Sequence, residues 1–176
     1  WAVLDKVSID YFNADARDSI EWTRDQLSAA DLEYLDAAKL IEVVQEITLV
    51  HSSPFSPEYF DYLQTLYDVQ LAFDHMATRL CFVGHSHWPV MFINTTPVDY
   101  FLREEFELPP DRRAVVNVGS VGQPRDSDPR ACYVIYESEQ QTVYLRRVDY
   151  DLHPASEKIL AAGLPATNAR RIILGR

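Results

Sequence analysis

Polar side chains follow three apolar runs of the chain, at the points where each run ends. His51 ends the first run, the sequence Gly-His-Ser-His at 84–87 ends the second, and Gly-Ser-Val-Gly-Gln-Pro-Arg at 119–125 ends the third. In α/β sheets, ligands bind beyond the carboxyl ends of the strands. We therefore expect the three polar segments to converge on one site.

The histidine pair at 85 and 87 indicates a metal site. In an extended backbone, residues i and i+2 project to the same side, so His85 and His87 can reach one metal ion or two adjacent ones. Gly84 allows a tight turn just before them. Neutral imidazole suits zinc, iron, nickel and manganese. Together with His51 they form a candidate ligand set; the alternative is that all three are ordinary loop histidines.

The loop at 119–125 offers donors for an anion. Its backbone amides, the Ser120 hydroxyl and the Arg125 guanidinium are all compatible with phosphate. A tight turn packed against the sheet explains the glycines equally well, so both interpretations stay open. The charged residues that follow, Asp126, Asp128 and Arg130, are expected to be solvated.

The other histidines and the aromatic groups have structural explanations. His75 falls in the last turn of a predicted helix, where a cation is favoured by the helix dipole. His153 is expected just before the C-terminal helix and at the surface. The aromatic groups at 59–62 and 100–101 either line a substrate pocket or pack in the core with their hydroxyls at the surface.

Hydrophobic periodicity and capping residues predict the elements that must position these groups. The predicted helices span 13–27, 29–36, 65–76 and 154–162. The predicted strands span 40–44, 47–50, 80–83, 90–94, 114–118, 132–136 and 142–148. The first two strands are expected to pair, and the last two to form a hairpin. This mixture predicts a single α/β domain over residues 1–176.

Composition and charge narrow the possible partners. The chain has 176 residues, of which 47% are hydrophobic and 24% charged, and no apolar run approaches the length of about 20 residues needed to span a bilayer. Its 27 acidic and 16 basic residues give a net charge of −11, which repels nucleic acid and anionic membranes. A small phosphorylated substrate remains compatible, because a bound metal supplies positive charge locally.

The two cysteines indicate a compartment. Cys81 and Cys132 lie far apart in apolar stretches and are expected to be buried free thiols, which fits a reducing cytoplasm. The sequence predicts no oligomeric state.

Taken in order, the three polar segments resemble late motifs of the calcineurin-like metallophosphoesterases. They are Leu-Val-His-Ser-Ser-Pro at 49–54, Val-Gly-His-Ser-His-Trp-Pro at 83–89, and Asn-Val-Gly-Ser-Val-Gly-Gln-Pro-Arg-Asp at 117–126. More narrowly, the chain resembles small bacterial and archaeal members often labelled predicted phosphodiesterases or diadenosine-tetraphosphatase-like proteins. The resemblance covers nearly the whole chain.

The resemblance implies a fold and a set of ligands. The fold would be a four-layer αββα sandwich of two mixed sheets, with two divalent metal ions (Mn, Fe, Ni or Zn) beside the strand ends. His51 and His85 would bind one ion and His87 the other. The loop at 119–125 would lie beside them, and Arg125 and Ser120 are expected to contact substrate. Ser52 stands where relatives usually have Gly.

Two further family motifs, Gly-Asp and Gly-Asn-His-Asp, are absent from this sequence, and the family's Asp-x-His does not occur ahead of the three polar segments; the one match to it is at 151–153, after them. In relatives, a segment like 1–27 directly follows Gly-Asn-His-Asp. We therefore expect the chain to be the C-terminal portion of the domain, without the N-terminal βαβ segment that carries the bridging carboxylate. The 176-residue chain alone is expected to be inactive and to bind at most one metal weakly.

The expected function of the intact protein is hydrolysis of phosphomonoesters or phosphodiesters at a dinuclear metal site, with the substrate and the metal left open. One alternative is a mononuclear zinc hydrolase with three histidine ligands and an open water position. The other is a non-catalytic binding module on the same fold.

Overall fold

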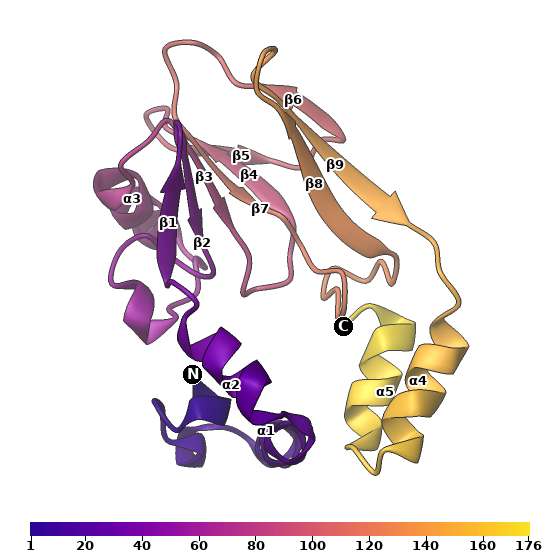
Figure 1. The fold of residues 1–176 in the computed structure, drawn as a ribbon. Coiled ribbons are helices and arrows are strands. Elements are labelled where there is room, and N and C mark those ends of the chain that lie inside the picture. The colour runs from indigo at the N-terminus through magenta and orange to yellow at the C-terminus, as the bar shows by residue number, and fades with distance from the viewer. The chain divides into compact units, whose positions relative to one another are not determined.

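The computed structural model describes residues 1–176 and contains five α-helices and nine strands (Figure 1). The helices are α1 (Ala14–Gln26), α2 (Ala29–Asp36), α3 (Leu66–His75), α4 (Leu152–Ala161) and α5 (Ala166–Leu174). The strands are β1 (Ile41–Val44), β2 (Ile47–Val50), β3 (Leu80–Val83), β4 (Val90–Ile93), β5 (Asp99–Phe101), β6 (Glu105–Glu107), β7 (Ala114–Asn117), β8 (Ala131–Glu137) and β9 (Thr142–Val148).

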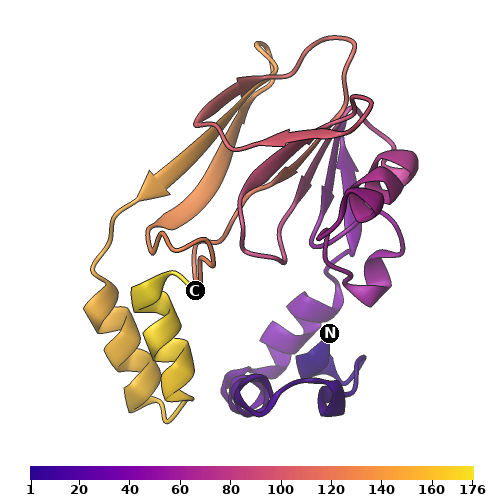
Figure 2. The same cartoon turned by 180° about the vertical axis from the view of Figure 1, so that it is seen from behind.

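The chain divides into two compact units. One consists of residues 1–39 and 151–174, and the other of residues 40–150 with 175–176. In the first unit α4 and α5 lie side by side (Figure 2), and Asn168 of α5 donates a hydrogen bond to Ser19 Oγ of α1 over 2.9 Å. The single domain over 1–176 stays a prediction. None of the helices has the length and apolar character needed to cross a membrane.

Two sheets form the second unit. The six-stranded sheet has the order β1-β2-β3-β7-β4-β5, with β2, β3 and β7 parallel to one another and the other pairings antiparallel. The three-stranded sheet has the order β6-β9-β8. It is antiparallel throughout rather than mixed as expected, because the short turn between β8 and β9 can join only antiparallel neighbours.

Apolar side chains fill both faces of the six-stranded sheet. One core cluster lies between the two sheets and includes Leu80, Met91 and Val116 from the first sheet with Val143 and Leu145 from the second. The other core cluster lies between the six-stranded sheet and α3. The second unit is therefore layered as helix, sheet and sheet, and the expected α/β fold with two sheets is confirmed.

Local signals placed most elements correctly. Asn13, Ser28 and Thr65 cap α1, α2 and α3 with side-chain hydrogen bonds, and the last two form capping boxes. The helix α4 begins two residues earlier than predicted because Asp151 caps it, so His153 lies inside its first turn. The strands β5 and β6 were not predicted; each has three residues, too few to show an alternating pattern.

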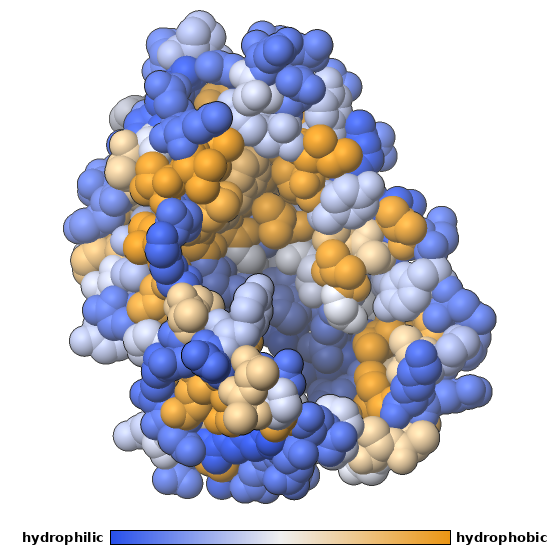
Figure 3. Space-filling view, in the orientation of Figure 1, coloured by the Kyte–Doolittle hydropathy of each residue, from blue (hydrophilic) through white to orange (hydrophobic).

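Part of the six-stranded sheet is not covered by the second sheet. Leu49 pairs in register with Phe82, which packs against the core between the sheets, yet Leu49 itself is 41% exposed. Val44 on the neighbouring strand is 47% exposed. Figure 3 shows this apolar surface over β1 and β2. The three strands of the second sheet are thus too few to cover all of the first.

Substitution of Gly119 tests how tightly the end of β7 is packed. Gly119 has a φ of +75°, and an added Cβ would lie 2.6 Å from Cys132 Sγ. We expect Gly119→Ala to lower the free energy of unfolding by about 2 kcal/mol or more, because it combines backbone strain with overpacking. Urea denaturation followed by circular dichroism measures the change.

Gly122 in the same loop is the matched control. An added Cβ there meets nothing within 4 Å and its φ is not left-handed. Gly122→Ala should change the free energy of unfolding by less than about 0.5 kcal/mol. Equal stability of the two variants would contradict the packing described for Gly119.

Candidate functional site

The three polar segments meet at one edge of the six-stranded sheet. They follow β2, β3 and β7, which are adjacent and parallel, so their carboxyl ends coincide. Backbone hydrogen bonds continue past the strands: Gly84 N donates to His51 O over 2.9 Å, and Val118 N donates to Val83 O over 2.9 Å. The structure therefore brings the three segments together, as the sequence predicts.

His51 and His85 form a direct pair. His51 Nε2 lies 3.0 Å from His85 Nδ1, and the two rings meet edge to face with centroids 4.9 Å apart. Tyr62 stacks on His85 with a centroid distance of 4.2 Å and an interplanar angle of 26°. Phe60 meets His51 edge to face at 6.2 Å. Aromatic contacts thus hold both imidazoles in place.

His87 is held separately by the loop at 119–125. Its Nδ1 lies 2.7 Å from the carbonyl oxygen of Gln123. Since a carbonyl only accepts, Nδ1 carries the hydrogen and Nε2 of the neutral ring keeps its lone pair free. Arg125 N donates to His87 O over 3.2 Å and ties the two loops together. No group of three or more His, Cys, Asp or Glu side chains has the spacing of a metal site.

The backbone around His85 and His87 is not extended, so the prediction that they project to the same side as residues i and i+2 of an extended segment is wrong. His85 has a φ of 62° and His87 a φ of 59°, both in the left-handed region. Each costs about 1–2 kcal/mol for a residue with a Cβ. The cause is local: Ser86 N donates to Gly84 O over 2.7 Å, which closes a tight turn instead of continuing β3.

Asn117, the last residue of β7, holds this turn. It is 3% exposed, and its Nδ2 donates to Gly84 O over 2.6 Å and to Ser86 Oγ over 2.9 Å. Its Oδ1 accepts from Gly119 N over 3.0 Å. The sequence indicates Asn117 only as part of the motif at 117–126. A polar side chain ending a fully buried apolar strand was the signal that could have identified it.

Burial keeps the histidines neutral. Burial lowers the pKa of His85 to about 4, helped by the positive charges of His51, His87 and Arg125. Partial burial also lowers the pKa of His51, although one side of it faces solvent. Burial lowers the pKa of His87, partly offset by its hydrogen bond to Gln123. All three rings are therefore neutral near pH 7; Nε2 of His87 keeps its lone pair free, while the contact between His51 Nε2 and His85 Nδ1 places a hydrogen on one of those two nitrogens.

Two polar atoms of the site lack partners. The buried atoms Ser52 Oγ and Arg125 Nε make no hydrogen bond, and the third such atom, Arg24 Nε, belongs to the other unit. Buried polar groups are rarely left unpaired without a reason. Both unpaired atoms lie on residues next to the candidate ligands, since Ser52 follows His51 directly and Arg125 N is hydrogen-bonded to His87 O.

The loop at 119–125 is both a turn and a lining of the site. Ser120 Oγ accepts from Gln123 N over 2.9 Å, so its hydroxyl braces the turn; its role as a substrate contact stays a prediction. Asp126 is not solvated as expected, because its side chain is 8% exposed and ion-paired with Arg147 of β9. This buried pair fixes the chain directly after Arg125.

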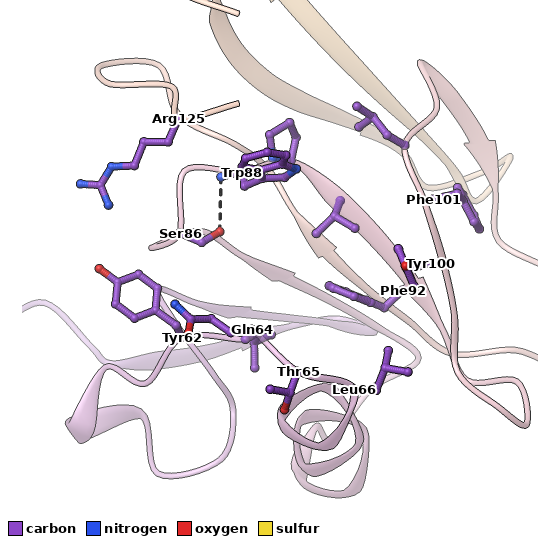
Figure 4. A pocket seen from close by; sticks show the side chains of 14 residues that line it. Tyr62, Gln64, Thr65, Leu66, Ser86, Trp88, Phe92, Tyr100, Phe101 and Arg125 are labelled. Atoms are coloured by element: carbon purple, nitrogen blue, oxygen red, sulfur yellow. Dashed lines mark hydrogen bonds between the residues drawn. The ribbon is translucent and has the colours of Figure 1, made fainter. Parts of the chain in front are cut away.

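A pocket of about 1020 Å³ opens beside the histidine loop. Figure 4 shows Arg125, Ser86 and the Tyr62 hydroxyl toward one end and Phe92, Tyr100, Phe101 and Leu66 toward the other. Of the two alternatives for the aromatic groups at 59–62 and 100–101, pocket lining holds for Tyr62, Tyr100 and Phe101 but not for Tyr59 and Phe60. We call the two ends the polar end and the apolar end.

The donors present fit one divalent ion better than two. His51 Nε2 and His85 Nδ1 share a hydrogen bond of 3.0 Å, and a divalent ion that replaced the shared hydrogen would take both imidazole nitrogens as ligands. A second dication would have His87 alone and no carboxylate from a clustered group. His51 and His85 can thus hold one ion, with further ligands from outside this set.

Comparison with known proteins gives the family. No family model matches the chain. The uncharacterized protein MJ0912 of Methanocaldococcus jannaschii is 36% identical over 181 residues, which cover 100% of this chain and 72% of that protein. The crystal structure of a metallophosphoesterase from Sphaerobacter thermophilus matches with a TM-score of 0.87 and 34% identity, over 100% of this chain and 74% of that one.

A more distant structure shares the fold alone. The hypothetical protein PH1004 from Pyrococcus horikoshii is 19% identical, with a TM-score of 0.72, over 98% of this chain and 64% of that one. The Sphaerobacter structure shows more than a shared fold, because its sequence identity and its structural agreement both extend over the whole of this chain. The chain belongs to the calcineurin-like metallophosphoesterase superfamily.

Proposed function

We propose that this chain supplies part of the active site of a metal-dependent phosphoesterase, which hydrolyses phosphomonoester or phosphodiester bonds. The observation that carries the proposal is the pair of His51 and His85, 3.0 Å apart at the ends of adjacent parallel strands, in a chain of this superfamily. When bound, a divalent ion polarises a phosphoryl oxygen and lowers the pKa of the water that attacks phosphorus.

The residues of this chain prepare the site for such chemistry. His51 and His85 would hold one ion (Mn, Fe, Ni or Zn), and His87 would offer Nε2 to a second, because its Nδ1 hydrogen is committed to Gln123. Arg125 and the donors around it would orient the anionic substrate. A catalytic acid or base is not assigned to any residue of the chain.

The donor set limits what the chain can do by itself. Three neutral imidazoles carry no negative charge to balance two dications, and bridged two-metal sites depend on carboxylate oxygens. The proposed dinuclear activity therefore requires ligands beyond His51, His85 and His87. A mononuclear site of three histidines gains no support, since the side chains do not group as three ligands.

Partners and compartment follow as part of the proposal. A small phosphorylated substrate suits the guanidinium of Arg125 at the site, whereas a net charge of −11 disfavours nucleic acid. Both cysteines are free and buried, which is consistent with a reducing cytoplasm. The oligomeric state is left open.

Metal binding provides the first test. With free Mn²⁺ at about ten times its dissociation constant, we expect a stabilisation of roughly 1.4 kcal/mol and a rise of about 3–6 °C in the melting temperature. His51→Ala and His85→Ala should each remove the shift, because each removes one of the paired nitrogens. Differential scanning fluorimetry measures it, and EDTA should reverse it.

His153→Ala is the matched control for the histidine variants. His153 is exposed in the first turn of α4, which belongs to the other unit, and its substitution should leave the Mn²⁺ shift intact. A chain whose stability does not respond to Mn²⁺, Zn²⁺, Ni²⁺ or Fe²⁺ would favour the non-catalytic binding module over the proposed function.

Turnover provides the second test. With Mn²⁺ and bis-nitrophenyl phosphate, we expect the 176-residue chain to release nitrophenol no faster than Mn²⁺ alone, because its three imidazoles do not balance two dications. The metallophosphoesterase of Sphaerobacter thermophilus is the positive control. Rapid turnover that is lost in His85→Ala would show that the donors of this chain suffice, against our expectation.

A further inference from the structure

The apolar end of the pocket exposes large side chains that a folded protein usually covers. Tyr100 is 61% exposed and Leu66 46%, and Phe92 beside them is 8% exposed; Trp88, nearer to Ser86 in Figure 4, is 55% exposed. Contiguous apolar surface in a concave site marks a place where a ligand or partner binds. The apolar end therefore requires an occupant with an apolar surface of its own.

The polar end presents donors that the protein does not use. Ser86 Oγ accepts from Asn117 Nδ2 over 2.9 Å and from Trp88 N over 3.3 Å. Asn117 must donate here, because its other partner on the same nitrogen is the carbonyl of Gly84. Both lone pairs of the Ser86 hydroxyl are thus occupied, and its own hydrogen remains free to donate.

Arg125 adds charge to the same end. Its Nη2 donates to Gln123 Oε1 over 3.3 Å, and its Nη1 makes no hydrogen bond within the protein. A guanidinium with unused donors beside a donating hydroxyl matches the oxygens of a phosphate group. The polar end thus requires an anion, and the apolar end adjoins it within one pocket.

From this arrangement we infer that the pocket binds a phosphate ester whose organic group is a planar aromatic ring. The phosphate would meet Arg125 and Ser86, and the ring would lie against Trp88, Phe92 and Tyr100. Aromatic rings gain from stacked or edge-to-face contact with such walls beyond the burial of their area. The inference rests on the proposed function, because it names the substrate class of that same site.

Two non-hydrolysable ligands test the inference on the full chain. Phenylphosphonate and methylphosphonate share the anionic head and differ in the ring. By isothermal titration calorimetry, we expect phenylphosphonate to bind at least ten-fold more tightly than methylphosphonate. Equal affinities for the two would overturn the inference. Phenol that bound as tightly as phenylphosphonate would also overturn it, since the pocket would then recognise no phosphate.

Substitutions at exposed positions separate the two ends. Trp88→Ala and Tyr100→Ala should reduce the ratio of the two affinities to less than three-fold, while Trp22→Ala, a partly exposed tryptophan of α1, should preserve it. Ser86→Ala and Arg125→Gln should weaken both ligands by a similar factor and leave the ratio unchanged. Arg112→Gln, at a partly exposed arginine outside the pocket, serves as the control for charge.

The same titrations distinguish this inference from the proposed function. The ratio of the two affinities reports the ring pocket, and we expect the same ratio of at least ten-fold with and without Mn²⁺. The strengthening of methylphosphonate binding by Mn²⁺ reports the metal site. If the ratio exceeds ten and Mn²⁺ has no effect, the ring pocket is supported and the proposed metal-dependent function is contradicted. If Mn²⁺ strengthens methylphosphonate binding and the ratio is near one, the proposed function is supported and the ring pocket is contradicted.

Discussion

The buried amide of Asn117 holds together the two loops from which the site is built. Through three hydrogen bonds it fixes the carbonyl of Gly84, the hydroxyl of Ser86 and the backbone N–H of Gly119. Leaving such groups unpaired in a buried place costs about 1–3 kcal/mol each. The positions of both loop histidines depend on this one side chain. The direction in which the Ser86 hydroxyl donates depends on it as well.

The strained backbone of the histidine loop persists because its surroundings leave no alternative. His85 and His87 both adopt left-handed conformations, which a free loop would avoid. Asn117 Nδ2 donates a hydrogen bond to Gly84 O, which ties the turn to β7. Gly84 N donates a hydrogen bond to His51 O, which ties the turn to the residue after β2. Strain of this kind is typical of positions where function requires a fixed geometry, and here it aims two imidazoles.

Local and global electrostatics differ in this protein. The chain as a whole carries a net charge of −11, yet the charge that acts on His85 near pH 7 is the positive charge of Arg125. Burial keeps the imidazoles neutral, so they suit a cation, while Arg125 and Ser86 suit the anion beside it. Arg125 and Ser86 line the same pocket as the aromatic side chains, so a phosphate and a ring would share that pocket.

The sequence by itself determined the helices with capping residues, most of the buried strands and the three polar segments, because periodicity and caps are local signals. It missed the three-residue strands β5 and β6, which are stabilised by pairing and not by their own pattern. It also predicted an extended backbone at His85 and His87, whereas both residues are left-handed. Only the tertiary structure decided that His51 meets His85, that Asn117 bridges the loops and that Asp126 is buried against Arg147. These contacts join residues far apart in the chain, so no local pattern records them.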